Sequence, residues 1–329
     1  MGRRGGAAMT AAKEVSAFAD ALEAARVRRP TREEAHVLFE GALADEASLD
    51  ALCRVAVDVR AAELGDRCER EAAFNSVVPC YLRPLCLYCP YWRNPDQELM
   101  TVEDVVGYVR ILHDETDIRQ FHLSGGSMRG GGDCGIIAIV EAIRAAGFDD
   151  MRIVVNCGAS FSDADLRRLK ELNVMRIFSV FETTNPQLFA RVKPGDDLAE
   201  KIDFARRIAA AGMEVGSGIM AGIGNREHAV DDYVNELFDL ASLEGLACVY
   251  VSKFRHAAGI PLNDHPACPL PEALALVAMA RLVLRDVHIR AAAGWGAEDQ
   301  ARAVGAGAGS VSVERSFSKG SGHWATPGA

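Results

Sequence analysis

Short apolar segments alternate with amphipathic helical segments along most of this chain, and this alternation limits the possible folds more than any other feature. The apolar segments are rich in β-branched residues and lack a polar alternation, which is typical of strands buried on both faces of a parallel sheet. They lie at residues 72–78, 118–124, 151–157, 175–181, 213–219, 246–252, 287–293 and 310–313. Eight strand–helix units over about 250 residues predict an α/β fold, a TIM-type (β/α)8 barrel. A doubly wound open sheet is the alternative.

The residues before the first of these strands are predicted to be helical. Apolar residues recur there at helical spacing, and Thr31 with Glu34 has the spacing of a capping box. The predicted helices lie at residues 10–27, 32–43 and 47–64. The N-terminal sequence MGRRGGAAMTAAKE has no apolar segment of signal-peptide length, so we expect a disordered leader.

These patterns divide the chain into three parts. We expect a leader and helical extension over residues 1–70 and the barrel over residues 71–315. The remaining residues, 316–329, are polar and rich in glycine and are expected to form a disordered C-terminal tail. No linker rich in proline, glycine or serine separates two halves of the barrel region, which indicates one catalytic domain.

The net charge and hydrophobic content of the chain limit the kinds of partner that it can bind. The chain has 329 residues, of which 49% are hydrophobic, and a net charge of −10. An acidic balance argues against a nucleic-acid partner, because binding of that kind requires a basic surface. No apolar run approaches the roughly 20 residues of a membrane-spanning helix. We therefore expect neither a nucleic acid nor a membrane as partner, and a cytoplasmic location.

Three of the nine cysteines lie within the segment CYLRPLCLYC, residues 80–89. Five residues separate Cys80 from Cys86, and two separate Cys86 from Cys89. In a chain without a secretory signal, such a group indicates metal ligation rather than disulfides. Zinc sites usually combine two closely spaced ligand pairs, and the sequence has no second pair, which favours an iron–sulfur cluster. For the metal, the alternative is a zinc site completed by a distant histidine. For the function, it is a non-enzymatic zinc or iron–sulfur protein that uses the three cysteines as a structural clip.

Other chemically distinctive residues also follow predicted strands. Cys80 follows the first strand, the glycine-rich sequence SGGSMRGGG (124–132) follows the second, and Glu182 follows the fourth. The carboxyl ends of barrel strands meet at one face, where the active sites of this fold lie. The pattern therefore predicts that these residues share one site at that face.

These features resemble the radical S-adenosylmethionine (SAM) superfamily. The resemblance rests on three cysteines after the first strand, an aromatic residue, Tyr88, directly before the last of them, and Gly-Gly after the second strand. The segment ETTNPQLFARVKPGDDLAEKIDFARRIAAAGMEVGSGIMAGIG (182–224) is similar to the one that holds SAM in biotin synthase and its relatives. Those relatives include methylornithine synthase and the radical maturase of iron–iron hydrogenase. The resemblance covers about residues 30–315.

The cysteine spacing differs from the spacing of three and then two residues that is common in this superfamily. Within the biotin synthase-like group, a spacing of five and then two residues resembles that of the protein linked to synthesis of the iron-guanylylpyridinol cofactor of iron-only hydrogenase. The resemblance implies that Cys80, Cys86 and Cys89 ligate a [4Fe–4S] cluster whose open iron binds SAM. The fourth ligand of the cysteine group would then be SAM itself.

The resemblance also implies contacts to SAM. The implied contact residues are Tyr88, Ser124, Gly125, Gly126, Ser127, Glu182, Lys201 and Met220. The backbone of the Gly-Gly motif would receive the methionyl amino group, and Glu182 the ribose or amino group. Lys201 lies where the relatives often have an arginine for the methionyl carboxylate. A lysine keeps the charge and replaces a bidentate contact by a single point.

Six further residues are candidates for contacts to a substrate in the barrel. They are His122, Asn156, Ser179, Tyr250, Arg255 and Arg290. Asn156 and Ser179 lie near the carboxyl ends of the third and fourth strands, where substrate contacts are expected. Arg255 and Arg290 favour an anionic substrate if they face the interior. For Ser179 core packing is the alternative, and for His122 a buried structural histidine.

The resemblance implies a radical SAM enzyme, in which the reduced cluster cleaves SAM to a deoxyadenosyl radical that abstracts hydrogen from a substrate. The implied partners are this small-molecule substrate and an external low-potential electron donor such as ferredoxin or flavodoxin. The cysteine spacing implies a role in making the pyridinol part of the iron-guanylylpyridinol cofactor. A mutase or lyase that acts on an amino acid, like methylornithine synthase, is the alternative.

Overall fold

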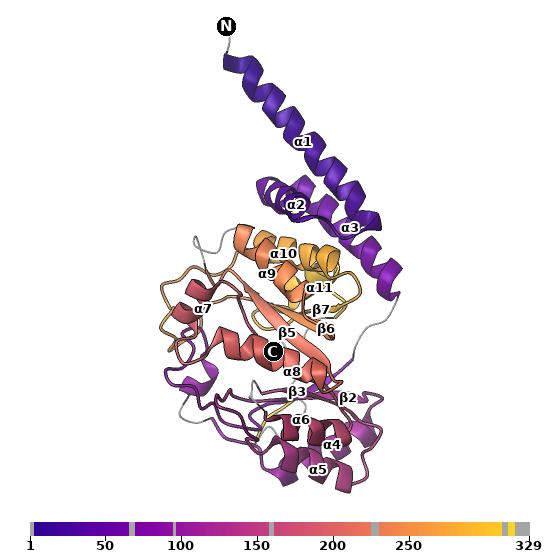
Figure 1. Ribbon diagram of the computed structural model, residues 1–329, viewed down its shortest axis with the longest axis vertical. Coiled ribbons are helices and arrows are strands. Elements are labelled where there is room, and N and C mark those ends of the chain that lie inside the picture. The colour runs from indigo at the N-terminus through magenta and orange to yellow at the C-terminus, as the bar shows by residue number, and fades with distance from the viewer. Residues whose placement is uncertain are drawn as a thin grey trace.

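A computed structural model describes residues 3–65, 70–94, 97–157, 161–224, 230–310 and 315–319. Eight parallel strands form one curled sheet with helices around it, as a half-barrel of the TIM type (Figure 1). The strands are β1 (Ala72–Phe74), β2 (Gln120–Ser124), β3 (Arg152–Asn156), β4 (Val174–Phe178), β5 (Glu214–Ala221), β6 (Leu246–Lys253), β7 (His288–Ala291) and β8 (Arg315–Phe317). The predicted α/β barrel class is therefore confirmed.

Three helices precede the first strand, and the other helices lie between successive strands. The first three are α1 (Arg3–Val27), α2 (Arg32–Ala44) and α3 (Glu46–Leu64). The others are α4 (Val102–Glu115), α5 (Ile136–Ala145), α6 (Asp163–Glu171), α7 (Pro186–Val192), α8 (Leu198–Ala210), α9 (Val230–Ala241), α10 (Leu270–Val283) and α11 (Ala297–Val304), with a 3-10 turn, η1 (Tyr91–Arg93). Consecutive strands with a helix between them are expected to lie side by side in a parallel sheet.

The strand order follows the chain, β7-β6-β5-β4-β3-β2-β1-β8. Each neighbouring pair is parallel, from β6 with β7 at one edge to β1 with β8 at the other. Within the described residues no ladder joins β7 to β8, and a single parallel bridge connects Arg290 of β7 to Ser310. In the described part of the chain, the two edge strands β7 and β8 are therefore not joined by a ladder, and the barrel is open between them.

The strands are buried on both faces, as their uninterrupted apolar sequences predict. On the concave side a small cluster of Val154, Phe178, Cys248 and Tyr250 packs inside the barrel. The ring centroids of Phe178 and Tyr250 lie 4.2 Å apart. Side chains that point inward from the strands therefore fill part of the interior, and those nearest the carboxyl ends are left to line a site.

The N-terminal helices form the extension at the top of Figure 1, in which α2 and α3 pack against α10, α2 also packs against α9, and α1 packs on α2 and α3. The capping box predicted for α2 is confirmed, because Thr31 Oγ1 accepts the Glu34 N–H at 3.2 Å and Glu34 Oε2 accepts the Thr31 N–H at 2.8 Å. Arg285, just after α10, ties the extension to the barrel. Its guanidinium donates to the Ala25 carbonyl at 2.9 Å and to Glu63 at 2.6 Å.

The structure differs from the sequence predictions at both ends. α1 begins at Arg3, where a disordered leader was expected, because the alanine-rich sequence has a high helix propensity. The eighth strand lies at Arg315–Phe317, beyond the predicted 310–313, and Phe317 stacks on Phe74 of β1 with ring centroids 4.9 Å apart. Two residues of the expected tail thus belong to the sheet, and residues 320–329 lie outside the described part.

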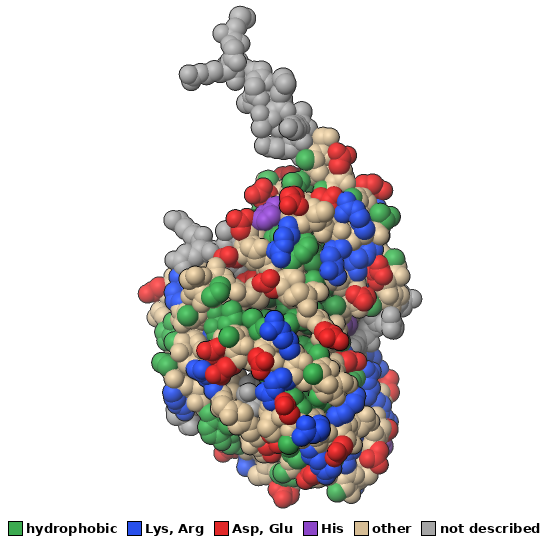
Figure 2. Space-filling view, viewed as in Figure 1, with side chains coloured by type: hydrophobic (Ala, Val, Ile, Leu, Met, Phe, Trp, Pro, Cys, Tyr) green, Lys and Arg blue, Asp and Glu red, His purple; other side chains and the backbone are tan. Residues whose placement is uncertain are grey.

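The helices and the charged surface can be compared with the expectations for a membrane or nucleic-acid partner. In the described part of the chain, no helix combines the length and apolar character needed to cross a bilayer. Figure 2 shows Lys and Arg side chains interspersed with Asp and Glu over the face that it draws.

Candidate functional site

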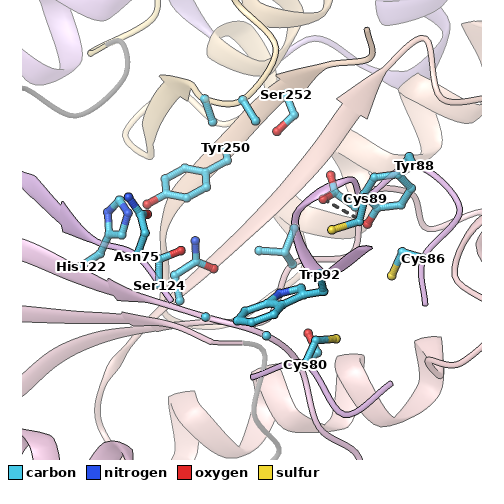
Figure 3. Close-up of a pocket in the computed structure, with 18 of the residues that line it drawn as sticks. Asn75, Cys80, Cys86, Tyr88, Cys89, Trp92, His122, Ser124, Tyr250 and Ser252 are labelled. Atoms are coloured by element: carbon cyan, nitrogen blue, oxygen red, sulfur yellow. Dashed lines mark hydrogen bonds between the residues drawn. The ribbon is translucent and has the colours of Figure 1, made fainter. Parts of the chain in front are cut away.

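A cavity of about 500 Å³ lies at the carboxyl ends of the strands (Figure 3). The cysteine loop after β1, the glycine-rich turn after β2 and Glu182 after β4 all contribute to its lining. Deeper in the barrel, the lining includes Asn156 of β3, Tyr250 of β6 and Arg290 of β7. The structure thus brings together the motifs that the strand-end pattern predicted to share one site.

The cysteine loop is held by one guanidinium group. The three cysteines of the loop are free thiols, each partly buried, and Figure 3 shows them along one side of the cavity. Arg93 of η1 donates to the carbonyl oxygens of Leu85 at 3.3 Å, Cys86 at 2.9 Å and Cys89 at 3.1 Å. A single cation therefore fixes the backbone around two of the three cysteines.

The position of the remaining cysteine, Cys80, is set by the glycine-rich turn. The Gly126 N–H donates to the Val78 carbonyl at 3.0 Å, and the Tyr81 N–H donates to the Ser127 carbonyl at 2.8 Å. A Cβ on Gly126 would lie 2.1 Å from the Cys80 Cα and 2.2 Å from its N. Only glycine permits this approach. The turn predicted to contact SAM therefore also positions one of the three cysteines of the loop.

Burial favours the neutral form of two of the three thiols. Burial raises the pKa of Cys86 to about 11. Burial also raises the pKa of Cys89, although the N–H groups of Tyr91 and Trp92 hydrogen-bond to it. Among the described residues, no three His, Cys, Asp or Glu side chains are arranged to hold one metal ion. A [4Fe–4S] cluster takes each thiolate at a different iron and therefore does not require the three side chains to meet at one metal ion.

Glu182 presents a buried carboxylate to the cavity. It lies just beyond β4 with a φ of 67° and bridges to Ile219 of β5, and its carbonyl accepts the Met220 N–H at 2.9 Å. Tyr88 donates to Glu182 Oε1 at 3.4 Å, while Oε2 is buried without a hydrogen-bond partner in the described residues. Burial raises the pKa of this carboxyl group. The arrangement fits a ligand that supplies an N–H or O–H donor.

Lys201 belongs to a buried group of three charges that borders the same cavity. Its Nζ lies 3.5 Å from Asp196 Oδ2, and Lys193 Nζ lies 3.0 Å from the same oxygen. Burial lowers the pKa of Lys201, and the charge of Lys193 lowers it further. The two lysines outweigh the effect of burial on Asp196 and lower the pKa of that carboxyl. Two ammonium groups and one carboxylate carry a net positive charge, which suits a carboxylate ligand.

The predicted substrate contacts divide into two sets. His122, Asn156, Tyr250 and Arg290 line the cavity. Arg290 forms a buried ion pair with Glu71, so its charge is already matched within the protein. This pairing removes one of the two reasons for expecting an anionic substrate.

Three predicted residues are not part of the lining. Arg255 is exposed on the segment after β6, which ends at Lys253, and the second reason for an anionic substrate is therefore also lost. Ser179 is fully buried and donates to the Lys201 carbonyl at 2.9 Å, which agrees with its alternative as a core residue. Met220 is buried in β5. Strand-end position alone predicts proximity to a site, whereas backbone hydrogen bonds and side-chain direction decide contact.

Several lining residues were missed by sequence reasoning. They are Asn75, Trp92, Lys193, Ser252 and Ser316. Figure 3 shows the Trp92 ring extending into the cavity on the side of the cysteine loop. The only sequence signal for Trp92 was its position three residues after Cys89. Lys193 lies inside the segment 182–224, but the resemblance assigned no contact to it, and Ser316 lies far from any motif.

The chain matches known proteins over most of its length. The family model described as the Radical SAM superfamily matches residues 77–237. A biotin synthase of Heliobacterium modesticaldum is 30% identical over 200 residues, 60% of this chain and 58% of that protein. An uncharacterized protein of Methanocaldococcus jannaschii is 25% identical over 215 residues, 64% of this chain and 56% of that protein. The chain therefore spans less than two thirds of either relative.

Two further likenesses cover more of the chain. The [FeFe] hydrogenase maturase subunit HydE of Thermotoga maritima is 26% identical over 284 residues, 84% of this chain and 76% of that protein. The crystal structure of methylornithine synthase aligns with a TM-score of 0.76 at 18% identity, over 94% of this chain and 89% of that chain. The second likeness supports the barrel fold. Radical SAM enzymes use a [4Fe–4S] cluster and SAM, so the predicted cofactors are confirmed at the level of the family. Over residues 77–237 the chain is therefore similar to the radical SAM superfamily, and the barrel fold agrees with this match.

Proposed function

We propose that this chain is a radical SAM enzyme of the biotin synthase-like group that acts on a small molecule in the barrel. One observation carries the proposal. Three cysteine thiols, a glycine-rich turn and a buried carboxylate with an unpartnered oxygen border the same cavity, at the face where barrel enzymes bind their substrates. A purely structural metal site does not require the carboxylate or the cavity.

Each part of the site has a role in this proposal. Cys80, Cys86 and Cys89 would hold the [4Fe–4S] cluster, which together with SAM supplies a deoxyadenosyl radical that removes hydrogen from a substrate. Glu182 would accept hydrogen bonds from the ribose or amino group of SAM, and Lys201 would bind its carboxylate with Lys193.

The rest of the SAM site would be formed by backbone and aromatic groups. No described residue donates to the carbonyl oxygens of Gly125 and Gly126, which suits the methionyl amino group. Tyr88 would lie against the adenine. Ser124 and Ser127 shape the turn, because their carbonyl oxygens accept the N–H groups of Val77 at 3.1 Å and Tyr81 at 2.8 Å. Met220, through its N–H bond to Glu182, would orient that carboxylate.

The position of the cavity suits radical chemistry. It continues from the cysteine loop into the barrel, where the walls are side chains of the strands. Enclosure by the barrel limits the access of water and oxidants to a reactive intermediate. An external low-potential electron donor, such as ferredoxin or flavodoxin, would reduce the cluster.

For the substrate, we propose a precursor of the pyridinol part of the iron-guanylylpyridinol cofactor. The support is the cysteine spacing of five and then two residues. A second candidate is a rearrangement or cleavage of an amino acid, which the fold likeness to methylornithine synthase supports. The two differ in the charges that the cavity has to match, because an amino acid carries both an ammonium and a carboxylate group.

Anaerobic reconstitution with iron and sulfide tests the enzyme proposal. We expect a brown protein with about four irons per chain that forms deoxyadenosine from SAM and dithionite. Changing Cys80, Cys86 or Cys89 singly to alanine should abolish deoxyadenosine formation. Cys134→Ala and Cys248→Ala are the matched controls and should retain it. A colourless protein that binds one zinc refutes the radical proposal.

The substrate proposal has a separate test in the host organism. Deletion of the gene should remove the iron-guanylylpyridinol cofactor, as measured by mass spectrometry of cell extracts. A host that keeps its cofactor after the deletion refutes the pyridinol role and leaves the radical chemistry untouched. The amino-acid alternative then gains support if the purified protein forms deoxyadenosine faster when an amino acid is added.

A further inference from the structure

A second polar cluster lies deeper in the barrel than the cysteines and Glu182. Its centre is Glu71, which is 2% exposed and precedes β1. Gln120 Nε2 donates to Glu71 Oε2 at 2.8 Å, His122 Nδ1 lies 3.0 Å from Oε1, and Arg290 forms an ion pair with Oε1. Arg290 also donates to Ser310 Oγ at 3.0 Å. The carboxylate of Glu71 is therefore surrounded by donors from two strands, β2 and β7.

This cluster determines which nitrogen of His122 carries the proton. An arginine side chain keeps its charge in proteins, and the carboxylate that faces Arg290 is consequently an anion that only accepts hydrogen bonds. His122 Nδ1 must then be the donor to Glu71. In a neutral imidazole the other nitrogen, Nε2, is an acceptor without a proton.

The cavity side of His122 has no protein partner. His122 lines the cavity, as Figure 3 shows, and among the described residues nothing hydrogen-bonds to Nε2. The residue is 8% exposed, and burial lowers its pKa to about 4, so the ring is neutral at physiological pH. A buried acceptor without a partner is destabilising, and a ligand that brings a donor relieves this penalty.

The neighbouring groups restrict the ligand further. Arg290 is matched by Glu71, so no unmatched cation lies beside His122 in the described lining. The side chains of Asn156 and Ser252 also line the cavity, and no described residue hydrogen-bonds to them. An amide and a hydroxyl group can each donate or accept. This part of the cavity therefore suits an uncharged, hydrogen-bonding part of a molecule, and the lone pair of His122 Nε2 repels a carboxylate.

We propose that His122 binds the substrate through its unprotonated Nε2, and that the substrate carries an O–H or N–H donor at this point. The inference rests on the proposed function, because it takes the cavity to be the substrate site. Glu71 acts through His122 as a positioning residue, since it fixes the tautomer and the ring orientation. His122 is then a determinant of specificity that selects for a donor group.

The tautomer can be measured without knowledge of the substrate. Imidazole ¹⁵N chemical shifts of the reconstituted protein, labelled on histidine, report which nitrogen carries the proton. His122→Gln, or His122→Asn if the first variant does not fold, identifies the signal. At neutral pH we expect His122 to be protonated on Nδ1 alone. His265 is the internal control, because its Nε2 lies 2.8 Å from the Gly222 carbonyl and must carry the proton.

Phenol and anisole then test the contact to the cavity, since they differ in a single hydroxyl group. We expect phenol to shift the His122 Nε2 resonance, and to bind about fivefold more tightly than anisole, the effect of one hydrogen bond of about 1 kcal/mol. A purely structural histidine would respond to neither compound. A proton on Nε2, a doubly protonated ring at neutral pH, or an Nε2 signal that phenol leaves unchanged overturns the proposal.

The same sample distinguishes this proposal from the proposed function. If SAM and dithionite yield no deoxyadenosine while His122 has the expected tautomer and responds to phenol, the proposed function fails and the donor-binding site stands. If deoxyadenosine forms and His122 does not respond, the enzyme proposal stands and the contact is refuted.

Discussion

Gly126→Ala should separate the folding of this protein from the assembly of its cluster. The turn that contains Gly126 packs directly on the backbone of Cys80, with the Gly126 N–H donating to the Val78 carbonyl at 3.0 Å. A methyl group on Gly126 would meet the Cα, N and Cβ of Cys80 at 2.1, 2.2 and 2.5 Å. Two of these atoms belong to the backbone, so no change of rotamer can relieve the overlap.

The size of the effect follows from these distances. Carbon atoms pack at about 3.5–4.0 Å, so the 2.1 Å contact has to widen by more than about 1 Å. Overpacking of this kind typically costs about 1–3 kcal/mol, less than the roughly 5–15 kcal/mol that keeps a domain folded. We therefore expect a folded variant in which Cys80 is displaced from Cys86 and Cys89. Cluster occupancy should fall severalfold, and deoxyadenosine formation with it.

The assay compares wild type, Gly126→Ala and Gly107→Ala after the same anaerobic reconstitution. Iron content and visible absorbance measure the cluster, and circular dichroism with urea unfolding measures the fold. Gly107→Ala is the matched control, because a Cβ at this position in α4 meets nothing within 4 Å. Gly107→Ala should keep full iron content and gain about 0.5–1 kcal/mol in stability. A Gly126→Ala protein that loads as much iron as Gly107→Ala refutes the reasoning.

Three further predictions concern single side chains. Burial raises the pKa of Glu182 above its usual 4.5, so the folded state binds this proton more tightly and stability falls as pH rises through that range. Glu182→Gln should therefore be more stable than wild type in urea at neutral pH while binding SAM more weakly in equilibrium dialysis; equal affinity would contradict the assigned role. Burial lowers the pKa of His122 from 6.5 to about 4, so its contribution to stability is complete above pH 6.5 and is lost as pH falls toward 4. The unfolding free energy of His122→Gln should depend less on pH in this window, and an unchanged slope would show that the imidazole does not titrate there. Arg93→Lys cannot reproduce the three hydrogen bonds from the guanidinium group to the carbonyl groups of the cysteine loop. This variant should lose iron to a chelator roughly tenfold faster than wild type, which is the effect of one or two lost hydrogen bonds. An unchanged rate would show that the guanidinium group does not hold the loop.

The fold and the outline of the site could be predicted because both depend on local patterns. Continuous apolar runs identify buried parallel strands, and the residues that follow these strands meet at one face. This rule correctly brought Cys80, Gly126 and Glu182 to one cavity. It could not decide on Arg255, because the strand period no longer sets side-chain direction once β6 has ended at Lys253.

The pairing of Glu71 with His122 could not be predicted for a different reason. The two residues are 51 positions apart, and their contact depends on the register between the segment before β1 and β2. Register is set by the packing of the whole sheet and shifts every side chain to the other face when it changes by one residue. Polar contacts of this kind inside a barrel follow from the three-dimensional structure alone.

The charge environment of Lys201 depends on neighbouring side chains that the sequence comparison did not single out. Taken alone, a lysine in place of an arginine gives up a bidentate contact to a carboxylate. In the structure Lys193 supplies a second ammonium group beside it, and Asp196 lies between the two at 3.0 and 3.5 Å. The Asp196 carboxylate lies against both ammonium groups and compensates part of their buried positive charge. In the proposed SAM site, the second lysine offsets the single-point contact of Lys201, because two separate ammonium groups would hold the carboxylate where one guanidinium group otherwise would.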